Sequence, residues 1–189
     1  MATVRLRKIR EEYSFKFEIC VKSFPLVREY NPHHRFNSYV ADAWQRASKE
    51  AAEDGILFNP WHYDDKNYPK SSMPAQVASK CVLLEGGESF DRFHLAIMKA
   101  FFEDNMDISD EKILISLAHD VDINMDTFTT HLTNHSIVDR VLSEYREAIE
   151  NYPGMGVPLA IFGRRYHIPG AVPIQIYKRV IDLLKKMKN

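Results

Sequence analysis

The chain has 189 residues, of which 45% are hydrophobic, and its formal net charge is −1. This length suits one domain with a sizeable core, and the interspersed charges argue against a nucleic-acid-binding surface. No apolar run approaches the length of a membrane span, and no signal-peptide pattern precedes the first expected helix. We therefore expect a single cytoplasmic domain over residues 1–189, without nucleic-acid or membrane partners.

The first elements expected are a helix and a strand. The basic stretch 5–13 places Leu6, Ile9 and Tyr13 on one helical face, and its charges are expected to form a solvated surface. Residues 15–24 then alternate apolar and polar side chains, which is the period of a β-strand. A Phe-Pro-Leu step ends this strand.

The middle of the chain is expected to be helical. Asn37 or Ser38 can cap a helix that ends at Gly55, and Pro74 lies in the first turn of the next. The Phe-rich run 88–105 predicts a largely buried helix. Further helices are expected after the cap candidates Ser109, Asn124, and Asn134 or Ser136.

Residues 154–171 are the most informative segment. A glycine-hinged loop leads to a Val157-Pro158 step, a strand at 159–162, a Gly turn and a second strand at 165–168. Proline lacks an N–H, so Pro158 begins the strand or caps an open edge. Because X-Pro is the common place for a cis peptide bond, we expect one here. It would expose the N–H and carbonyl of Val157 as a binding surface made of backbone.

This ending, followed by Gly-Ala and a last helix, resembles the end of the thioredoxin fold. More narrowly it is similar to the DsbA-like family, including the FrnE and 2-hydroxychromene-2-carboxylate isomerase relatives. The helix, strand and Phe-Pro-Leu opening, with Phe101-Phe102 before Asp107, extends the resemblance over nearly the whole chain. For the short motif alone, a hairpin in an unrelated α+β domain is the alternative.

The resemblance implies an α/β, thioredoxin-like fold with a large helical insertion at about 37–132. In this family the residue before the cis-proline packs against a Cys-x-x-Cys pair and holds an extended substrate chain. Those roles fall on Val157 and Pro158, which we take as the substrate-binding residues, with no catalytic residue assigned.

The cysteines do not supply that reactive pair. Thioredoxin-like chemistry uses Cys-x-x-Cys at a helix N-terminus, where a thiolate is stabilised and the second Cys resolves the mixed disulfide. This chain has two cysteines, Cys20 in the expected strand and Cys81 in a helix. We expect both to be structural, as small buried hydrophobes. A disulfide between them stays open, because sequence cannot establish the required geometry.

Residues 1–6 resemble the part of the family that follows its second active-site Cys. We hypothesise that the first strand and the Cys-x-x-Cys lie upstream of Met1; a natural variant that has lost the redox site is the alternative. The sheet would then have three strands, at 15–24, 159–162 and 165–168, and lack its first. An absent central strand leaves an exposed sheet edge, which predicts a homodimer or strand exchange.

Three functions follow from the resemblance. The first is a thiol–disulfide oxidoreductase acting on protein or small thiols, inactive as this chain because the catalytic pair is absent. The second is a redox-inactive peptide-binding or chaperone module. The third is a kappa-like glutathione-dependent isomerase or transferase, in which Val157 would hold glutathione. We favour the first, because the opening of the chain fits it, and we expect no cofactor apart from glutathione under the third.

Other chemistry has little support in the sequence. His131 and His135 have a spacing that can ligate metal on a helix, but Thr-Asn between them indicates a helix break and no third ligand is evident. The aromatic loop 58–63 is expected to belong to the core, and His167 to lie on the surface of the final hairpin.

Overall fold

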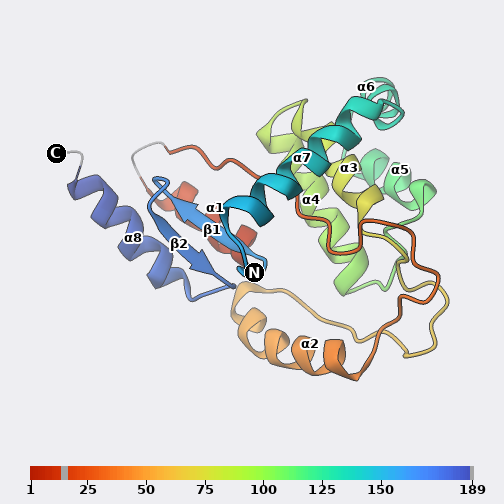
Figure 1. Ribbon diagram of the computed structural model, residues 1–189, viewed down its shortest axis with the longest axis horizontal. Coiled ribbons are helices and arrows are strands. Elements are labelled where there is room, and N and C mark those ends of the chain that lie inside the picture. The colour runs from red at the N-terminus through yellow and green to blue at the C-terminus, as the bar shows by residue number, and fades with distance from the viewer. Residues whose placement is uncertain (14–16, 188–189) are drawn as a thin grey trace.

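The computed structural model describes residues 1–13 and 17–187. Its helices are α1 (Ala2–Glu12), α2 (Ser38–Ala51), the 3-10 helix η1 (Ala52–Asp54), α3 (Met73–Leu83), α4 (Gly87–Phe102), α5 (Glu111–Asp120), α6 (Met125–Leu132), α7 (His135–Asn151) and α8 (Ile174–Lys186). Its strands are β1 (Leu159–Phe162) and β2 (Tyr166–Pro169). A helical block and a hairpin flanked by helices are the main parts, and α7 runs from one to the other (Figure 1).

The hairpin pairs β1 and β2 in antiparallel register, with Leu159 opposite Pro169. The turn between them requires φ values of +57° at Gly163 and +59° at Arg164, a region that glycine adopts readily. Helices α1 and α8 pack against the hairpin through a buried cluster. Its members are Ile9, Ile168, Tyr177 and Ile181. The two strands, the Gly turn and the last helix are therefore as expected, within one residue at β2.

The strand expected at 15–24 is not formed in its described part, residues 17–24, while residues 14–16 lie outside the described residues. Its backbone bonds to side chains instead. The Ser23 N–H donates to Oε2 of Glu144 over 2.7 Å, and the Val21 carbonyl accepts from Nζ of Lys80 over 3.4 Å. Apolar–polar alternation makes a strand only where a neighbouring backbone completes the ladder. The described sheet therefore has two strands rather than three.

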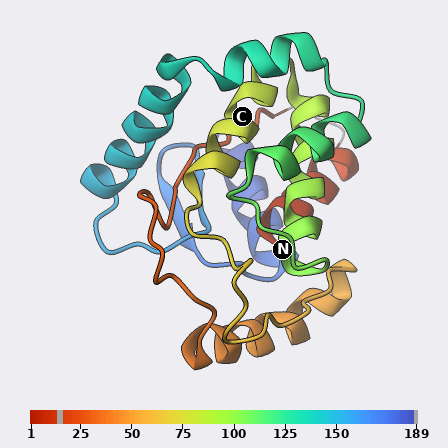
Figure 2. The same cartoon turned by 90° about the vertical axis from the view of Figure 1, so that its right-hand side faces the viewer.

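The helical block is organised around α3, which α4, α5, α6 and α7 enclose (Figure 2). The buried side chains here form the largest cluster of the described residues. They include Val77, Ala78, Cys81 and Val82 of α3, Phe90, Phe93 and Ile97 of α4, Leu114 and Ala118 of α5, Phe128 of α6, and Ile137 and Val141 of α7. Burial on this scale stabilises the block chiefly through the hydrophobic effect.

A separate aromatic cluster packs α2 against the loops around it. Phe36, Trp44 of α2, Trp61 and Tyr68 are all buried in one cluster, in which Trp44 packs edge-on against Phe36 with 5.3 Å between the ring centroids. The indole N–H of Trp61 donates to the carbonyl of Phe101, so its polar group is satisfied. The expectation that loop 58–63 belongs to the core is confirmed for Trp61, whereas Tyr63 remains 56% exposed.

Most of the helix caps expected from the sequence are confirmed. The side chains of Asn37, Asn124 and Asn134 each accept a hydrogen bond from a first-turn N–H. The cap expected at Ser109 is wrong. Its hydroxyl is bonded to Asp107, and Asp110 instead accepts from the N–H of Lys112.

No helix in the described part of the chain is long and apolar enough to cross a membrane.

Candidate functional site

The loop before β1 presents open backbone at Val157. The Val157–Pro158 peptide bond is cis, and the Pro158 carbonyl accepts from the N–H of Gly170 over 2.8 Å. Val157 is 42% exposed. Within residues 1–13 and 17–187, no hydrogen bond engages its N–H or its carbonyl. Both groups are therefore available to a ligand, and an extended polypeptide can form hydrogen bonds with them.

The outer edge of β1 continues this open backbone. Pro158 and Gly170 form a hydrogen-bonded pair, so the backbone groups of Leu159 and Ile161 point away from β2. No strand pairs with this edge among residues 1–13 and 17–187. An unpaired edge is a template for another extended chain, so Val157 and β1 together form one run of exposed backbone donors and acceptors.

Arg5 anchors the chain segment that follows β2. Its side chain is buried, and Nη1 donates to the carbonyls of Ala171 and Val172 over 3.1 and 2.8 Å. Nε donates to Asp54 over 2.7 Å. Arg5 thereby ties α1 and the end of η1 to the turn that follows β2. The expectation that the basic stretch is a solvated surface is wrong for Arg5, because its partners lie far away in the sequence.

The cysteines lie in different environments. Both are free thiols: Cys81 is buried in α3, and Cys20 is exposed in the segment after α1. Burial raises the pKa of the Cys81 thiol to about 11, so this residue remains protonated and unreactive at neutral pH. The expectation of a buried structural cysteine is confirmed for Cys81 and is wrong for Cys20, whose strand is not formed.

The histidines give no metal centre in the part of the chain that the structure describes, where no three His, Cys, Asp or Glu side chains gather. His167 is exposed on β2 and packs edge-on against Tyr152, with 5.1 Å between the ring centroids. The surface position expected for His167 is therefore confirmed.

His94 of α4 is a titratable group that the sequence did not single out. It stacks on Phe90, with ring centroids 5.3 Å apart. Burial lowers the pKa of His94 to about 4, and Arg7 lowers it further, whereas Asp91 raises it. His94 is therefore a neutral side chain at neutral pH. Sequence pattern alone carried no signal for it, because its charged neighbour Arg7 comes from a different helix.

Solved structures define the fold class. A candidate protein disulfide isomerase from Nitrosomonas europaea superposes with a TM-score of 0.74, at 20% identity, over 99% of this chain and 91% of that one. A candidate DsbA oxidoreductase from Streptomyces coelicolor gives a TM-score of 0.75, at 16% identity, over 94% and 80%. The chain therefore has a DsbA-like thioredoxin fold, and the expected fold class is confirmed. No family model matches the chain.

Two curated proteins resemble the chain in sequence. The ClpXP adapter protein SpxH of Bacillus subtilis is 20% identical over 183 residues, covering 93% of this chain and 60% of that protein. SpxH of Bacillus licheniformis is 21% identical over 181 residues, covering 93% and 59%. The chain thus spans about 60% of the length of these curated relatives. Kinship with the FrnE branch stays a prediction.

Proposed function

We propose that this chain is a redox-inactive polypeptide-binding module that works as a protein adapter on a DsbA-like fold. The observation that carries the proposal is the match, over 93% of the chain, to two proteins named ClpXP adapter proteins. An adapter binds a protein substrate and does not transform it chemically. The proposal needs a binding surface and requires no reactive thiol.

The binding surface we propose is Val157, Pro158 and the outer edge of β1. Exposed backbone at Val157 and at the edge offers hydrogen bonds to an extended chain whatever its side chains. Such recognition suits a module that holds unfolded or loop segments of protein substrates. We place the module in the cytoplasm, where thiols are kept reduced, and propose neither nucleic-acid nor membrane partners for it.

A thiol–disulfide oxidoreductase is the second candidate, favoured by the names of the two structural neighbours. Dithiol exchange needs a thiolate and a resolving thiol within reach of each other. Cys81 is buried with a raised pKa, and Cys20 is exposed on a different segment. As this chain, the candidate enzyme would therefore be inactive. A glutathione-dependent enzyme would use the same Val157 backbone, and glutathione would compete with polypeptide there.

Binding of a fluorescently labelled, reduced and alkylated unfolded protein tests the adapter proposal. We expect measurable binding that Val157→Pro weakens by about tenfold or more, since the substitution removes the N–H donor. Met155→Ala, at a position that is 38% exposed two residues earlier, is the matched control and should leave affinity unchanged. Absence of binding, or equal loss in both variants, would sink the proposal.

An insulin-reduction assay separates the two candidates. We expect no turnover above the dithiothreitol background. Turnover that disappears in Cys20→Ser would favour the oxidoreductase instead.

A further inference from the structure

A second surface lies on the segment that follows the extended stretch. Two adjoining cavities, of about 430 and 310 Å³, share Arg28 and Glu29. Residues 26–32 line the first, and α3 and α7 complete the second through Met73, Leu142, Tyr145 and Arg146. We call the two cavities together the 26–32 groove. None of its lining residues belongs to the Val157 loop or to β1.

The loop that forms the groove is fixed in place. The Val27 N–H donates to Oγ of Ser72 over 3.0 Å, and the Val27 carbonyl accepts from Oγ of Ser71 and the N–H of Ser72, each over 2.9 Å. Pro25, just before the loop, is buried. These bonds anchor the segment to the start of α3, so the groove is formed before any partner arrives.

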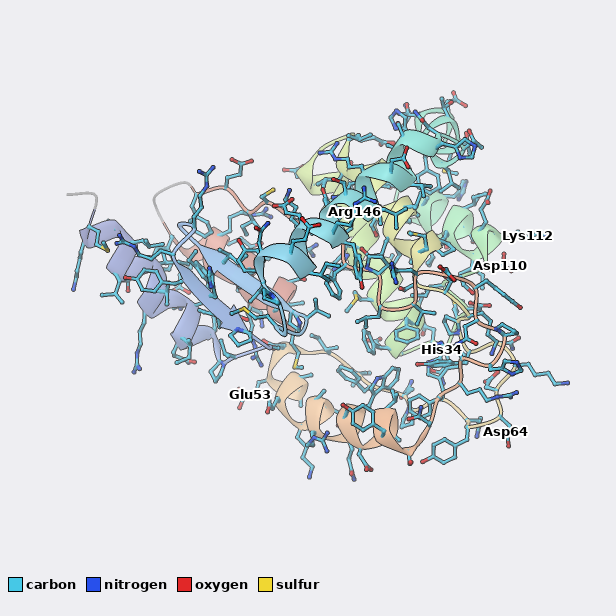
Figure 3. The ribbon with its side chains drawn as sticks, in the orientation of Figure 1. His34, Glu53, Asp64, Asp110, Lys112 and Arg146 are labelled. Carbon is cyan, nitrogen blue, oxygen red and sulfur yellow. The ribbon has the colours of Figure 1, made fainter. Side chains whose placement is uncertain are left out.

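Two arginines give the groove its charge. The Arg28 guanidinium lies 4.8 Å from the centroid of the Tyr145 ring, a stacking that leaves its N–H groups free at the edge. Arg146 follows Tyr145 on α7 (Figure 3). Within residues 1–13 and 17–187, neither side chain makes a hydrogen bond or ion pair. Against them stands one lining carboxylate, Glu29, so the groove has a surplus of uncommitted guanidinium groups.

The neighbouring charges contrast with this surplus because they are paired. Lys22 bonds to Glu147 over 3.2 Å, and Lys80 lies 2.7 Å from Glu144. The surplus is therefore local to Arg28 and Arg146. A carboxylate matches an uncommitted guanidinium fork in bidentate geometry.

Apolar side chains border the same surface. Leu26 and Tyr30 are 73% and 72% exposed, and Met73 and Leu142 line the second cavity. Large apolar side chains gathered beside a hollow mark a binding surface more often than single exposed residues do. A ligand that fits must bring both carboxylates and an apolar side chain.

We propose that the 26–32 groove binds a short acidic segment of a partner protein, with an aliphatic or aromatic side chain beside its carboxylates. This inference rests on the proposed function, since it gives the adapter a second, selective contact in addition to the sequence-tolerant backbone of Val157. Carboxylates of the segment bind Arg28 and Arg146, and its apolar side chain lies against Leu26 and Leu142.

The test uses a short fluorescein-labelled peptide that alternates acidic residues with Leu and Phe, and a control peptide with Lys at every acidic position. Fluorescence anisotropy should show binding of the acidic peptide alone, and added salt should weaken it. Arg28→Glu and Arg146→Glu should each weaken binding about tenfold or more. Lys112→Glu makes the same charge change on exposed α5, away from Arg146 (Figure 3), and should change affinity less than about twofold.

A matched apolar pair completes the test. Leu26→Ser should weaken the acidic peptide, whereas Leu57→Ser, at a position that is 62% exposed elsewhere, should not. Equal weakening by Lys112→Glu and Arg146→Glu would overturn the proposal, because it would show attraction to overall charge alone. Failure of the acidic peptide to bind would also overturn the groove proposal. A dimer in sedimentation experiments that only Arg28→Glu abolishes would overturn it too, because the groove would then bind a second copy of the chain.

The two proposals fail separately. If the unfolded protein binds through Val157 and the arginine variants leave both ligands unaffected, the groove proposal falls and the adapter proposal stands. If the acidic peptide binds the groove and the unfolded protein does not bind, the groove stands and the Val157 proposal falls.

Discussion

At the residue scale, Glu144 joins three segments through one carboxylate. It bonds to Lys80 and to the Ser23 N–H, each over 2.7 Å, and the two paired side chains are 8% and 3% exposed. Burial raises the pKa of Glu144, but the Lys80 ammonium and the Ser23 N–H together outweigh that effect and leave the pKa lowered. The segment that failed to form a strand is held to the helical block by this carboxylate.

Removing the negative charge of Glu144 should destabilise the folded protein. Glu144→Gln leaves the Lys80 ammonium buried without a counter-ion, so we expect the free energy of unfolding to fall by about 3 kcal/mol. Glu147→Gln is the matched control, because Glu147 pairs with Lys22 where both side chains are 51% exposed, and it should cost less than about 0.5 kcal/mol. Urea unfolding measures both. Similar losses in the two variants would contradict the role assigned to the buried pair.

The buried His94 predicts part of the pH dependence of the free energy of unfolding. Its pKa is about 4 in the folded protein and near the ordinary value of about 6.5 when unfolded. The unfolded chain therefore binds the proton first as pH falls. Stability from this group is intact above about pH 6.5 and is lost progressively toward about pH 4, by about 1–3 kcal/mol. His94→Asn should flatten this part of the profile, whereas His119→Asn, whose side chain is 79% exposed, should not.

At the element scale, Arg5 connects α1 to η1 and to the chain after β2. Its guanidinium donates to Asp54, to the carbonyls of Ala171 and Val172, and to the Glu50 carbonyl over 3.1 Å. A lysine ammonium carries its three N–H donors on one nitrogen, so it cannot reach all of these acceptors at once. Arg5 therefore connects α1, η1 and the chain after β2 around the end of the hairpin.

Arg5→Lys should lower the free energy of unfolding by about 2–3 kcal/mol, because buried acceptors lose their donors. Arg10→Lys makes the same exchange on the same helix, where the side chain is 41% exposed against Asp91, and should cost less than about 0.5 kcal/mol. Thermal and urea unfolding give the comparison. An Arg5→Lys protein as stable as Arg10→Lys would show that the alignment does not depend on the guanidinium fork.

Local signals explain what could be predicted from the sequence at this scale. Asn37, Asn124 and Asn134 cap helices through bonds made within three residues, so their effect is readable from neighbours. The segment 17–24 has strand periodicity, but whether it pairs depends on a distant backbone. Alternation could not reveal that Glu144 and Lys80 engage its backbone groups instead.

At the scale of the whole molecule, some binding residues can be recognised from neighbouring sequence, and others depend on contacts between distant parts of the chain. Val157 and Pro158 stand out in the sequence because glycines and an apolar run surround them. The Arg28–Tyr145 contact joins residues far apart in the chain, and the sequence around Arg28 does not predict it. The order of elements, through its resemblance to the DsbA-like family, predicted the fold class, although the strand expected at 15–24 is not formed in its described part. Surfaces built from several elements required the tertiary structure.

The unpaired edge of β1 predicts self-association. The backbone groups of Leu159 and Ile161 face away from β2, and no strand of residues 1–13 or 17–187 covers them. A second copy can pair there, so we expect a dimer that grows with concentration in sedimentation experiments. Ile161→Pro removes an outward N–H without disturbing the bonds to β2, and should shift the dimer dissociation constant upward about tenfold.

The matched control acts on β2, the strand that pairs with β1. His167→Ala changes an exposed side chain opposite Ile161 on β2 and leaves the outer backbone of β1 intact, so its dimerisation should equal that of the wild type. A compact monomer at all concentrations would show that the β1 edge does not drive association. Competition between dimerisation and binding of the unfolded protein would follow if both use this edge. Ile161→Pro should then weaken both equilibria together, because the same outward N–H serves the second copy and the extended substrate.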